Sequence, residues 1–219
     1  MAAPFYFPVF AVDDPLELDA MLAAVGLGTL ITNGPGGLTV THIPFVFDPA
    51  ARLLRGHVSF RNPHSQTGEG DALVLFSGPD AYVSPAFYPS KAVHGRVAPT
   101  WNYEFLHVHG PVRWINDPLW LRQNLEDLTN RHEHNRAEPW RVADAPPDFT
   151  EKLLLRIVGV EVGVERIEGR RKFSQNESDG NRMGVIAGLA ASAGLPEQRV
   201  AAAMMAQEAV CGAGGSDAS

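Results

Sequence analysis

Cysteine is almost absent from this chain of 219 residues. The one cysteine, Cys211, falls in a stretch rich in glycine, alanine and serine, so no internal disulfide can form. Proteins without disulfides are typical of a reducing compartment. We therefore expect a cytoplasmic protein.

Positive charge is also scarce. Lysine occurs only as Lys91, Lys152 and Lys172, and 25 acidic residues against 18 lysines and arginines give a formal net charge of -7. A duplex-binding surface needs lysine and arginine to neutralise several phosphates. The composition therefore argues against direct binding to DNA.

Long hydrophobic runs and several catalytic motifs are missing. No window approaches the roughly 18 consecutive apolar residues of a membrane-spanning helix, and the first residues lack the basic and apolar regions of a secretory signal. The glycine-rich phosphate loops and the Gly-x-Ser-x-Gly motif are absent too. We expect no membrane association, no secretory signal and no side-chain nucleophile.

Helical patterns occupy four parts of the chain, one of them a short turn that follows the capping spacing of Asp148 and Glu151. Asp14 and Pro15 can begin a helix, because aspartate caps helix N-termini and proline fits the first helical position. Asp117 and Pro118 predict a second helix in the same way. An alanine-rich helical region begins at about Asp179.

Strand patterns fill most of the remainder. The last of these segments is predicted to return as a hairpin after a turn at Glu168 and Gly169. Roughly seven or eight strands in hairpin order, with helices between and after them, indicate a mainly β, α+β barrel rather than a doubly wound sheet. The predicted strands are Thr29–Thr32, Leu38–Phe47, Leu53–Phe60, Ala72–Ser77, Thr100–Ile115, Val158–Val164 and Lys172–Ser174.

The chain is long enough for one domain with a helical appendage. We expect a barrel domain over residues 1–178, a C-terminal helical extension over residues 179–211 and a flexible tail over residues 212–219.

Polar aromatic residues, glycines and prolines are concentrated in a few segments. These are poor material for a hydrophobic core, because a buried polar group without a partner costs about 1–3 kcal/mol. A site for a flat, amphipathic ligand such as a flavin would explain them. The segments are Gly56–His64, Tyr82–Lys91, Pro99–Tyr103 and Lys172–Asn176.

Together with Pro139–Trp140 and Ile157–Gly159, these motifs resemble the series found in the PaiB family, described as FMN-binding negative transcriptional regulators. The resemblance spans about residues 5–190 in order. It implies an FMN-binding split β-barrel of the pyridoxamine-phosphate-oxidase type, decorated with peripheral and C-terminal helices. It also implies a homodimer with FMN at the subunit interface.

The resemblance assigns candidate cofactor-binding residues by strand order and motif. The phosphate and ring contacts of the superfamily come from the second and third barrel strands and the following turn. The candidates are Thr41, His42, His57, Val58, Arg61, Asn62, His64, Lys91, Trp101, Asn102, Lys172 and Gln175.

Structural roles compete with these assignments. Asn62 and Pro63 can simply begin a short helix, and Trp101 can be a barrel-core aromatic residue. His42 can be a hydrogen-bonded structural histidine, and Lys91 and Lys172 can be exposed to solvent.

Two His-x-His pairs raise the question of a metal site. His107 and His109 are two apart on a predicted strand, so their side chains point the same way. No third ligand follows at a useful spacing, and His132 and His134 lie near a helix end, where histidine interacts with the carbonyl dipole. We expect no metal site.

Two functions remain open. The first is PaiB-type negative regulation of transcription, acting indirectly because the chain is acidic. The alternative is an FMN-dependent oxidoreductase of the pyridoxamine-phosphate-oxidase superfamily that acts on a small molecule. In either case the flavin would perform any redox chemistry, and the protein would position it.

Overall fold

The computed structural model describes residues 7–213. This part of the chain forms two compact units. The barrel unit comprises residues 14–76 and 106–168, and the helix unit comprises residues 7–13, 77–105 and 169–213. The chain passes between the units within strands β6 (Gly70–Val83), β7 (Thr100–Ile115) and β9 (Arg166–Lys172).

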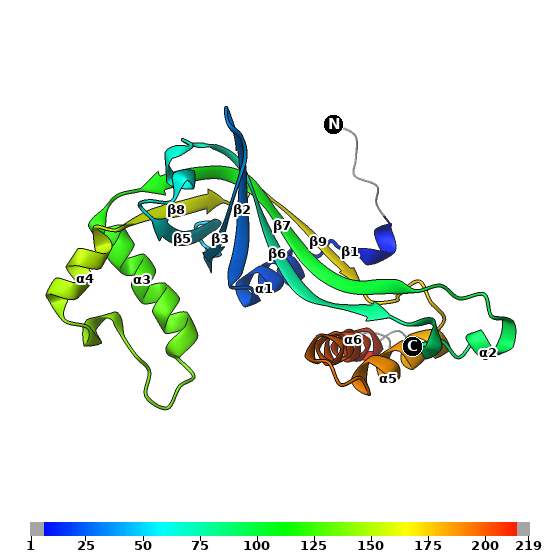
Figure 1. Cartoon of the computed structure of the whole chain (residues 1–219). Helices are drawn as coiled ribbons and strands as arrows, with labels where there is room; N and C mark the ends of the chain where they lie inside the picture. The colour runs from blue at the N-terminus through cyan, green and yellow to red at the C-terminus, as the bar shows by residue number, and fades with distance from the viewer. Residues whose placement is uncertain (1–6, 214–219) are drawn as a thin grey trace. The chain divides into compact units, whose positions relative to one another are not determined.

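The barrel unit contains most of the antiparallel sheet (Figure 1). Its strands are hydrogen-bonded in the order β3-β2-β6-β7-β8-β5-β4. The tight turn between β2 and β3 uses Gly37 at φ 94°, a backbone conformation that glycine adopts at little cost. The strands not yet given are β2 (Leu27–Gly34), β3 (Gly37–Pro44), β4 (Val46–Asp48), β5 (Leu53–Ser59) and β8 (Ile157–Gly163).

Alternation along these strands fills the barrel interior. In β5, Leu54, Gly56 and Val58 are buried, while the residues between them are more exposed. Period-two alternation places buried residues on one face. The resulting core also includes Leu30, Phe45, Phe76, Leu106, Val108 and Val160.

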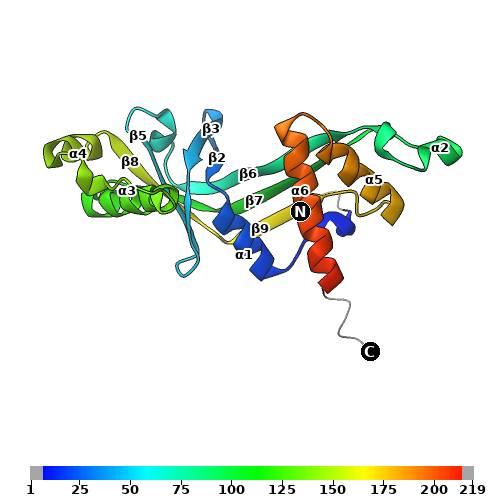
Figure 2. The same cartoon turned by 90° about the horizontal axis from the view of Figure 1, so that it is seen from below.

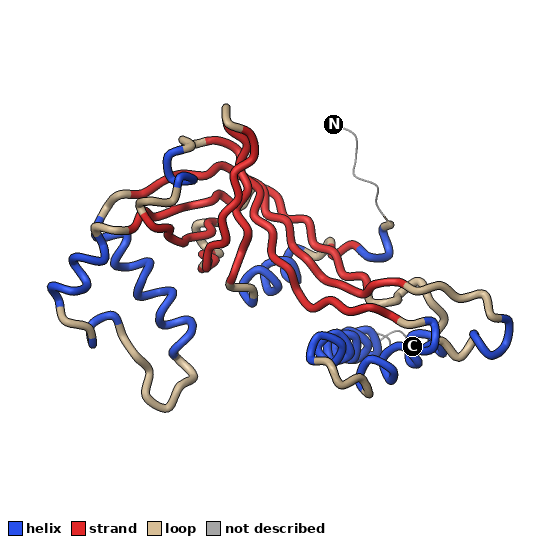
Figure 3. The backbone as a smooth tube through the Cα atoms, viewed as in Figure 1, coloured by secondary structure: helices blue, strands red, loops and turns tan. Residues whose placement is uncertain are grey.

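Helices flank the barrel strands in sequence. Asp14 caps α1 (Pro15–Ala24) by accepting the Leu16 N–H, and Asp117 caps α3 (Pro118–Glu133) by accepting that of Leu119. Figure 3 shows α3 and α4 (Pro147–Leu154) connected by a long loop that contains the 3-10 turn η4 (Val142–Asp144). A further 3-10 turn, η2 (Pro63–Gln66), follows β5.

The helix unit has its own core. Helices α5 (Asp179–Ala190) and α6 (Leu195–Ala213) lie beside the parts of β6 and β7 that belong to this unit (Figures 1 and 2). Strand β1 (Ala11–Val12) pairs antiparallel with β9. The unit also contains η1 (Pro8–Phe10), η3 (Pro85–Phe87) and α2 (Lys91–His94). Its buried side chains include Val83, Phe173, Val185, Leu189, Val200 and Met204.

The predicted fold class, mainly β with peripheral and C-terminal helices, is confirmed. The predicted turn at Glu168 and Gly169 is wrong, because both residues lie inside β9. Strand β9 pairs with β7 and β1 and not with β8. The chain instead turns just after β8, where the Glu165 N–H donates to the His109 carbonyl at 3.0 Å.

The C-terminal segments form helices of the helix unit. Helices α5 and α6 belong to the same compact unit as residues 77–105. Helix α6 ends at Ala213, so it includes Cys211 and the start of the expected tail. Residues 214–219 of that tail lie outside the described residues. No helix in the described part of the chain is long and apolar enough to cross a membrane.

Candidate functional site

A cleft of about 500 Å³ lies where β3 approaches the end of β5 and the turn that follows. We call it the β3–β5 cleft. Its volume falls within the range of cofactor sites. The lining residues are Thr39, Val40, Thr41, His42, Ser59, Arg61, Asn62 and Pro63.

Strand alternation supplies one wall of this cleft. Thr39 and Thr41 are half-buried on one face of β3, while Val40 and His42 on the other face are exposed. The Nδ1 atom of His42 lies 2.9 Å from the Thr29 hydroxyl. One face of β3 therefore presents the two threonine hydroxyls, and the His42 imidazole lies on the other, exposed face.

A hydrogen-bond network fixes Thr41 from behind. The fully buried His64 places Nδ1 3.0 Å from the Thr41 hydroxyl and Nε2 2.9 Å from that of Thr32. The Asn62 amide is 3.3 Å from the Thr41 hydroxyl, and its Oδ1 caps η2 by accepting the His64 N–H at 3.0 Å. Both ring nitrogens of His64 are thus occupied, so His64 positions Thr41 rather than facing a ligand.

Burial also determines the protonation state of His64. It lowers the pKa of His64 below its ordinary value of 6.5, which keeps the ring neutral at pH 7. A neutral ring accepts a hydrogen bond at one nitrogen and donates one at the other. His64 can therefore hold the two threonine hydroxyls on its two sides.

Arg61 gives the cleft its positive charge. Its side chain is exposed, and its guanidinium lies 5.5 Å from the ring centre of Phe60. Although the chain is acidic, no carboxylate of the described residues lines this cleft. Guanidinium and hydroxyl donors without a competing acid are suited to a phosphate.

His57 and Val58 face other parts of the barrel unit. The Nδ1 atom of His57 is 3.3 Å from the Asn124 amide on α3, and burial lowers the pKa of His57. Val58 is part of the barrel core. Neither side chain lines the β3–β5 cleft.

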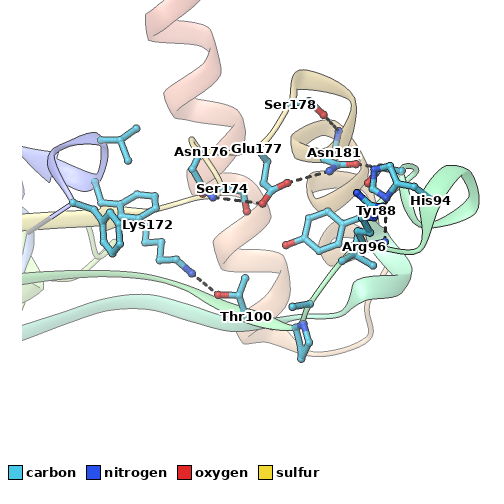
Figure 4. A pocket seen from close by; sticks show the side chains of 17 residues that line it. Tyr88, His94, Arg96, Thr100, Lys172, Ser174, Asn176, Glu177, Ser178 and Asn181 are labelled. Atoms are coloured by element: carbon cyan, nitrogen blue, oxygen red, sulfur yellow. Dashed lines mark hydrogen bonds between the residues drawn. The ribbon is translucent and has the colours of Figure 1, made fainter.

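The helix unit contains a separate cavity of about 700 Å³ (Figure 4). We call it the helix-unit cavity. Its polar lining includes Tyr88, His94, Arg96, Thr100, Lys172, Ser174, Asn176, Glu177, Ser178 and Asn181, with Phe10 and Val97 among its apolar residues. The Asn181 amide donates to Glu177 at 3.0 Å.

Lys172 is the sequence candidate that reaches this cavity. Its ammonium donates to the Thr100 hydroxyl and, at 2.8 Å, to the Trp101 carbonyl. Burial and the charge of Arg170 lower the pKa of Lys172, while Glu177 opposes them. The ammonium is therefore held by the protein at the cavity wall.

The other candidates of the helix unit lie outside the cavity lining. Asn102 is fully buried and donates to the Ser174 hydroxyl at 3.0 Å. Gln175 accepts the Phe173 N–H and donates to the Arg171 carbonyl, both at 2.6 Å. Trp101 is 53% exposed beside Tyr82, and Lys91 is exposed at the start of α2.

The structure adds residues that the sequence assignment missed. Thr39 and Ser59 line the β3–β5 cleft, and Arg96 and Asn181 line the helix-unit cavity. The spacing of Thr39 and Thr41 was a usable signal, because residues two apart on a strand share a face. Arg96 and Asn181 come from distant segments and carried no such signal.

Similarity to known proteins agrees with this architecture. The family described as "Putative FMN-binding domain" matches residues 5–166. The protease synthase and sporulation protein PAI 2 of Bacillus subtilis is 31% identical over 190 residues, covering 85% of this chain and 87% of the relative. An uncharacterized protein of Emericella nidulans is 34% identical over 212 residues, covering 74% and 84%.

Solved structures share the fold at low sequence identity. The FAD and heme binding protein of Mycobacterium smegmatis has a TM-score of 0.58 at 17% identity, covering 79% of this chain and 78% of that protein. The flavocytochrome Anf3 of Azotobacter vinelandii has a TM-score of 0.56 at 15% identity, covering 80% and 74%.

The fold is therefore that of the FMN-binding split barrels. This chain belongs to the FMN-binding domain family, and the PaiB-type resemblance seen in its motifs is confirmed.

Proposed function

We propose that this protein binds FMN, with the phosphate in the β3–β5 cleft. The observation that carries the proposal is an acid-free cleft in an acidic chain, lined by hydroxyls and by the Arg61 guanidinium. Those donors fit a phosphate dianion. FMN, when bound, supplies redox chemistry that the side chains lack.

The residues of the cleft would have different roles in binding the phosphate. Arg61 and the hydroxyls of Thr39, Thr41 and Ser59 would donate to phosphate oxygens. His64 and Asn62 would hold the Thr41 hydroxyl in place through the contacts they already make. Preorganised donors bind more tightly, because less ordering is needed on binding. Lys91, Trp101, Asn102, Lys172 and Gln175 remain proposed cofactor residues on the strength of the family motifs alone, as do His57 and Val58.

The cofactor would lie at the interface of a homodimer. Val40 lines the cleft with 54% of its surface exposed, and Leu38 and Phe60 nearby in sequence are 73% and 44% exposed. Exposed apolar side chains grouped around a ligand site are typical of a surface that a partner covers. A second copy of this chain is the partner that the family resemblance implies.

We assign the protein a PaiB-type role in negative regulation of transcription, exerted without direct contact to DNA. The regulatory role comes from the family resemblance, and the relative of Bacillus subtilis is named for protease synthase and sporulation. The basic run Arg170–Lys172 is already engaged within the protein. Arg171 pairs with Glu104 at 2.6 Å, Lys172 donates to Thr100, and the guanidinium of Arg170 lies 5.8 Å from the ring centre of Phe10.

A comparison of FMN with riboflavin tests the phosphate assignment. Riboflavin lacks the phosphate, so the wild-type protein should bind it at least about tenfold more weakly than FMN, a difference of about 1.4 kcal/mol. Fluorescence quenching of the free flavins measures both affinities. Equal affinities would show that the β3–β5 cleft does not bind the phosphate of FMN.

Fluorescence anisotropy tests the claim of indirect regulation. The FMN-saturated protein should show no sequence-specific binding to labelled promoter DNA of its own organism at about 150 mM salt, because its net charge opposes approach to a polyanion. Submicromolar binding that survives excess competitor DNA would contradict the claim.

The helix-unit cavity favours a second function, an FMN-dependent oxidoreductase. Its volume of about 700 Å³ and its lining, which combines Arg96, Lys172 and Glu177 with apolar side chains, suit a small polar molecule. Anaerobic titration of the FMN-loaded protein with NADH and NADPH separates the two functions. Rapid bleaching of the flavin would favour the enzyme, and a stable oxidised flavin would favour the regulator.

A further inference from the structure

We infer that His107, His109 and Glu168 form a binding site for a divalent transition-metal ion such as Zn²⁺. The site lies within the barrel unit and shares no residue with the β3–β5 cleft. It uses the His-x-His pair for which the sequence offered no third ligand. The third ligand comes from β9, the strand that pairs with β7.

The fold places the three side chains on one face. Leu106 and Val108 of β7 point into the barrel core, so His107 and His109 point away from it. All three proposed ligands are about 30% exposed, with side-chain values of 29%, 31% and 30% for His107, His109 and Glu168. The three side chains are therefore partly exposed, although the Nε2 atom of His109 itself is covered.

The backbone beside the site is tightly fixed. The N–H of Glu165 donates to the His109 carbonyl at 3.0 Å, just before β9 begins. The next residue, Gly110, packs so closely on β8 that an added Cβ would lie 1.8 Å from the Gly163 carbonyl oxygen. The Glu165 hydrogen bond therefore holds the His109 backbone beside the start of β9, and the Gly110 packing holds it beside β8.

The distances suit a tetrahedral ion. The Oε2 atom of Glu168 is 3.5 Å from His107 Nδ1 and 3.6 Å from His109 Nε2. Bonds of about 2.0–2.1 Å around tetrahedral zinc place neighbouring ligand atoms about 3.4 Å apart. One ligand atom of each residue lies within 4.8 Å of the others, so a small ring rotation closes the remaining separation. Among the described residues, this is the group of histidine and acidic side chains with such spacing.

One of the proposed ligand atoms lacks a hydrogen-bond partner among the described residues. The Nε2 atom of His109 is buried and has no hydrogen-bond partner in the described structure. Imidazole nitrogens without another hydrogen-bond partner are common ligands of transition-metal ions.

Arg166 contacts the carboxylate oxygen of Glu168 that does not face the histidines. It pairs with Oε1 of the carboxylate, which leaves Oε2 facing the two histidines. Hydrogen-bonded carboxylates are common behind metal ligands, because the second contact orients them. The arginine charge nevertheless repels a cation, so it should limit the affinity.

Titration of the full-length protein after EDTA treatment tests the site. Calorimetry with Zn²⁺ should show one ion per chain with a dissociation constant of about micromolar or below. Co²⁺ should give the visible d–d absorption of a four-coordinate ion, which reports nitrogen and oxygen ligands directly. His107→Ala and Glu168→Gln should each weaken Zn²⁺ binding at least about a hundredfold.

The other His-x-His pair supplies the matched control. A variant with both His132→Ala and His134→Ala removes two histidines at the same spacing, and its Zn²⁺ affinity should equal that of the wild type. Arg166→Gln should tighten binding by up to about tenfold, because a positive charge near the ion is removed. This gain cannot result from unfolding, so it tests the site even if a ligand variant is unstable.

Three results would overturn the inference. The first is no Zn²⁺ binding tighter than about millimolar. The second is wild-type affinity in His107→Ala and Glu168→Gln. The third is weaker binding in Arg166→Gln.

Discussion

Single residues in the β3–β5 cleft perform different tasks. Arg61 is exposed and supplies charge, whereas His64 is fully buried and supplies position. A change at Arg61 should therefore alter the affinity for FMN, and a change at His64 should alter the stability of the protein.

Arg61→Ala should raise the dissociation constant for FMN by about 10- to 100-fold. Hydrogen bonds to charged groups contribute about 1.5–3 kcal/mol, and about 1.4 kcal/mol corresponds to a factor of ten. The melting temperature without FMN should stay nearly unchanged, because Arg61 contacts little besides Phe60. Arg113, 60% exposed and paired with Glu161 in the same unit, provides the control variant Arg113→Ala. An equal loss of affinity in both variants would refute the assignment.

His64 should make the stability of the protein depend on pH. Burial lowers its folded-state pKa below the ordinary value of 6.5. Between the folded and unfolded pKa values, the unfolded chain binds more protons, so the free energy of unfolding falls as the pH drops below about 6.5. Urea unfolding at a series of pH values measures this slope.

His64→Asn should reduce that slope and lower stability at neutral pH by about 1–3 kcal/mol, because Thr32 and Thr41 lose their shared partner. Part of the slope should remain, since burial also lowers the pKa of His57, His107 and His109. An unchanged slope in the variant would show that the pKa of His64 does not differ between the folded and the unfolded protein.

At the scale of secondary-structure elements, the sequence predicted correctly those features that depend on contacts between neighbouring residues. Asp14 and Asp117 begin α1 and α3 because each side chain accepts a backbone N–H two residues later, a contact encoded within three positions. Strand β9 was misplaced because Glu168 and Gly169 resemble a turn, whereas pairing with β7 and β1 makes them extended. That pairing depends on distant residues, which no local window contains.

The site assignments follow the same rule. Thr41, His42, Arg61 and Asn62 lie on successive strands and the next turn, and they line one cleft. The inward and outward faces of β5 separate Val58 from His57. The buried role of Asn102 depends on Ser174 and Met204, far along the chain, so its sequence neighbours gave no sign of it.

Close packing of β7 against β8 makes Gly110 a sensitive position. Gly110→Ala should lower the free energy of unfolding by about 2–4 kcal/mol, because the added methyl group overlaps the Gly163 carbonyl oxygen. Gly70 at the start of β6 has open space where a Cβ would lie, so Gly70→Ala should change stability by no more than about 0.5 kcal/mol. Urea unfolding of the two variants makes the comparison. A loss of stability in Gly110→Ala no larger than that in Gly70→Ala would show that β7 and β8 can move apart at little cost.

At the scale of the whole molecule, the protein should be a homodimer. Light scattering should give about twice the chain mass of 23.7 kDa. Val40→Asp places a charge among the exposed apolar side chains of the cleft rim and should shift the protein toward monomer. Leu16→Asp, at an 80% exposed position on α1, should leave the dimer intact. A wild-type monomer at micromolar concentration would contradict the proposed interface.

The central claim is that this chain holds FMN, and equilibrium titration of the flavin-free protein tests it most directly. Added FMN should lose fluorescence and saturate at one molecule per chain, with a dissociation constant of about a micromolar, roughly -8 kcal/mol. FAD should bind more weakly, because its additional nucleotide has no binding motif in the sequence. If neither flavin changes its fluorescence or raises the melting temperature of the protein, the claim is contradicted.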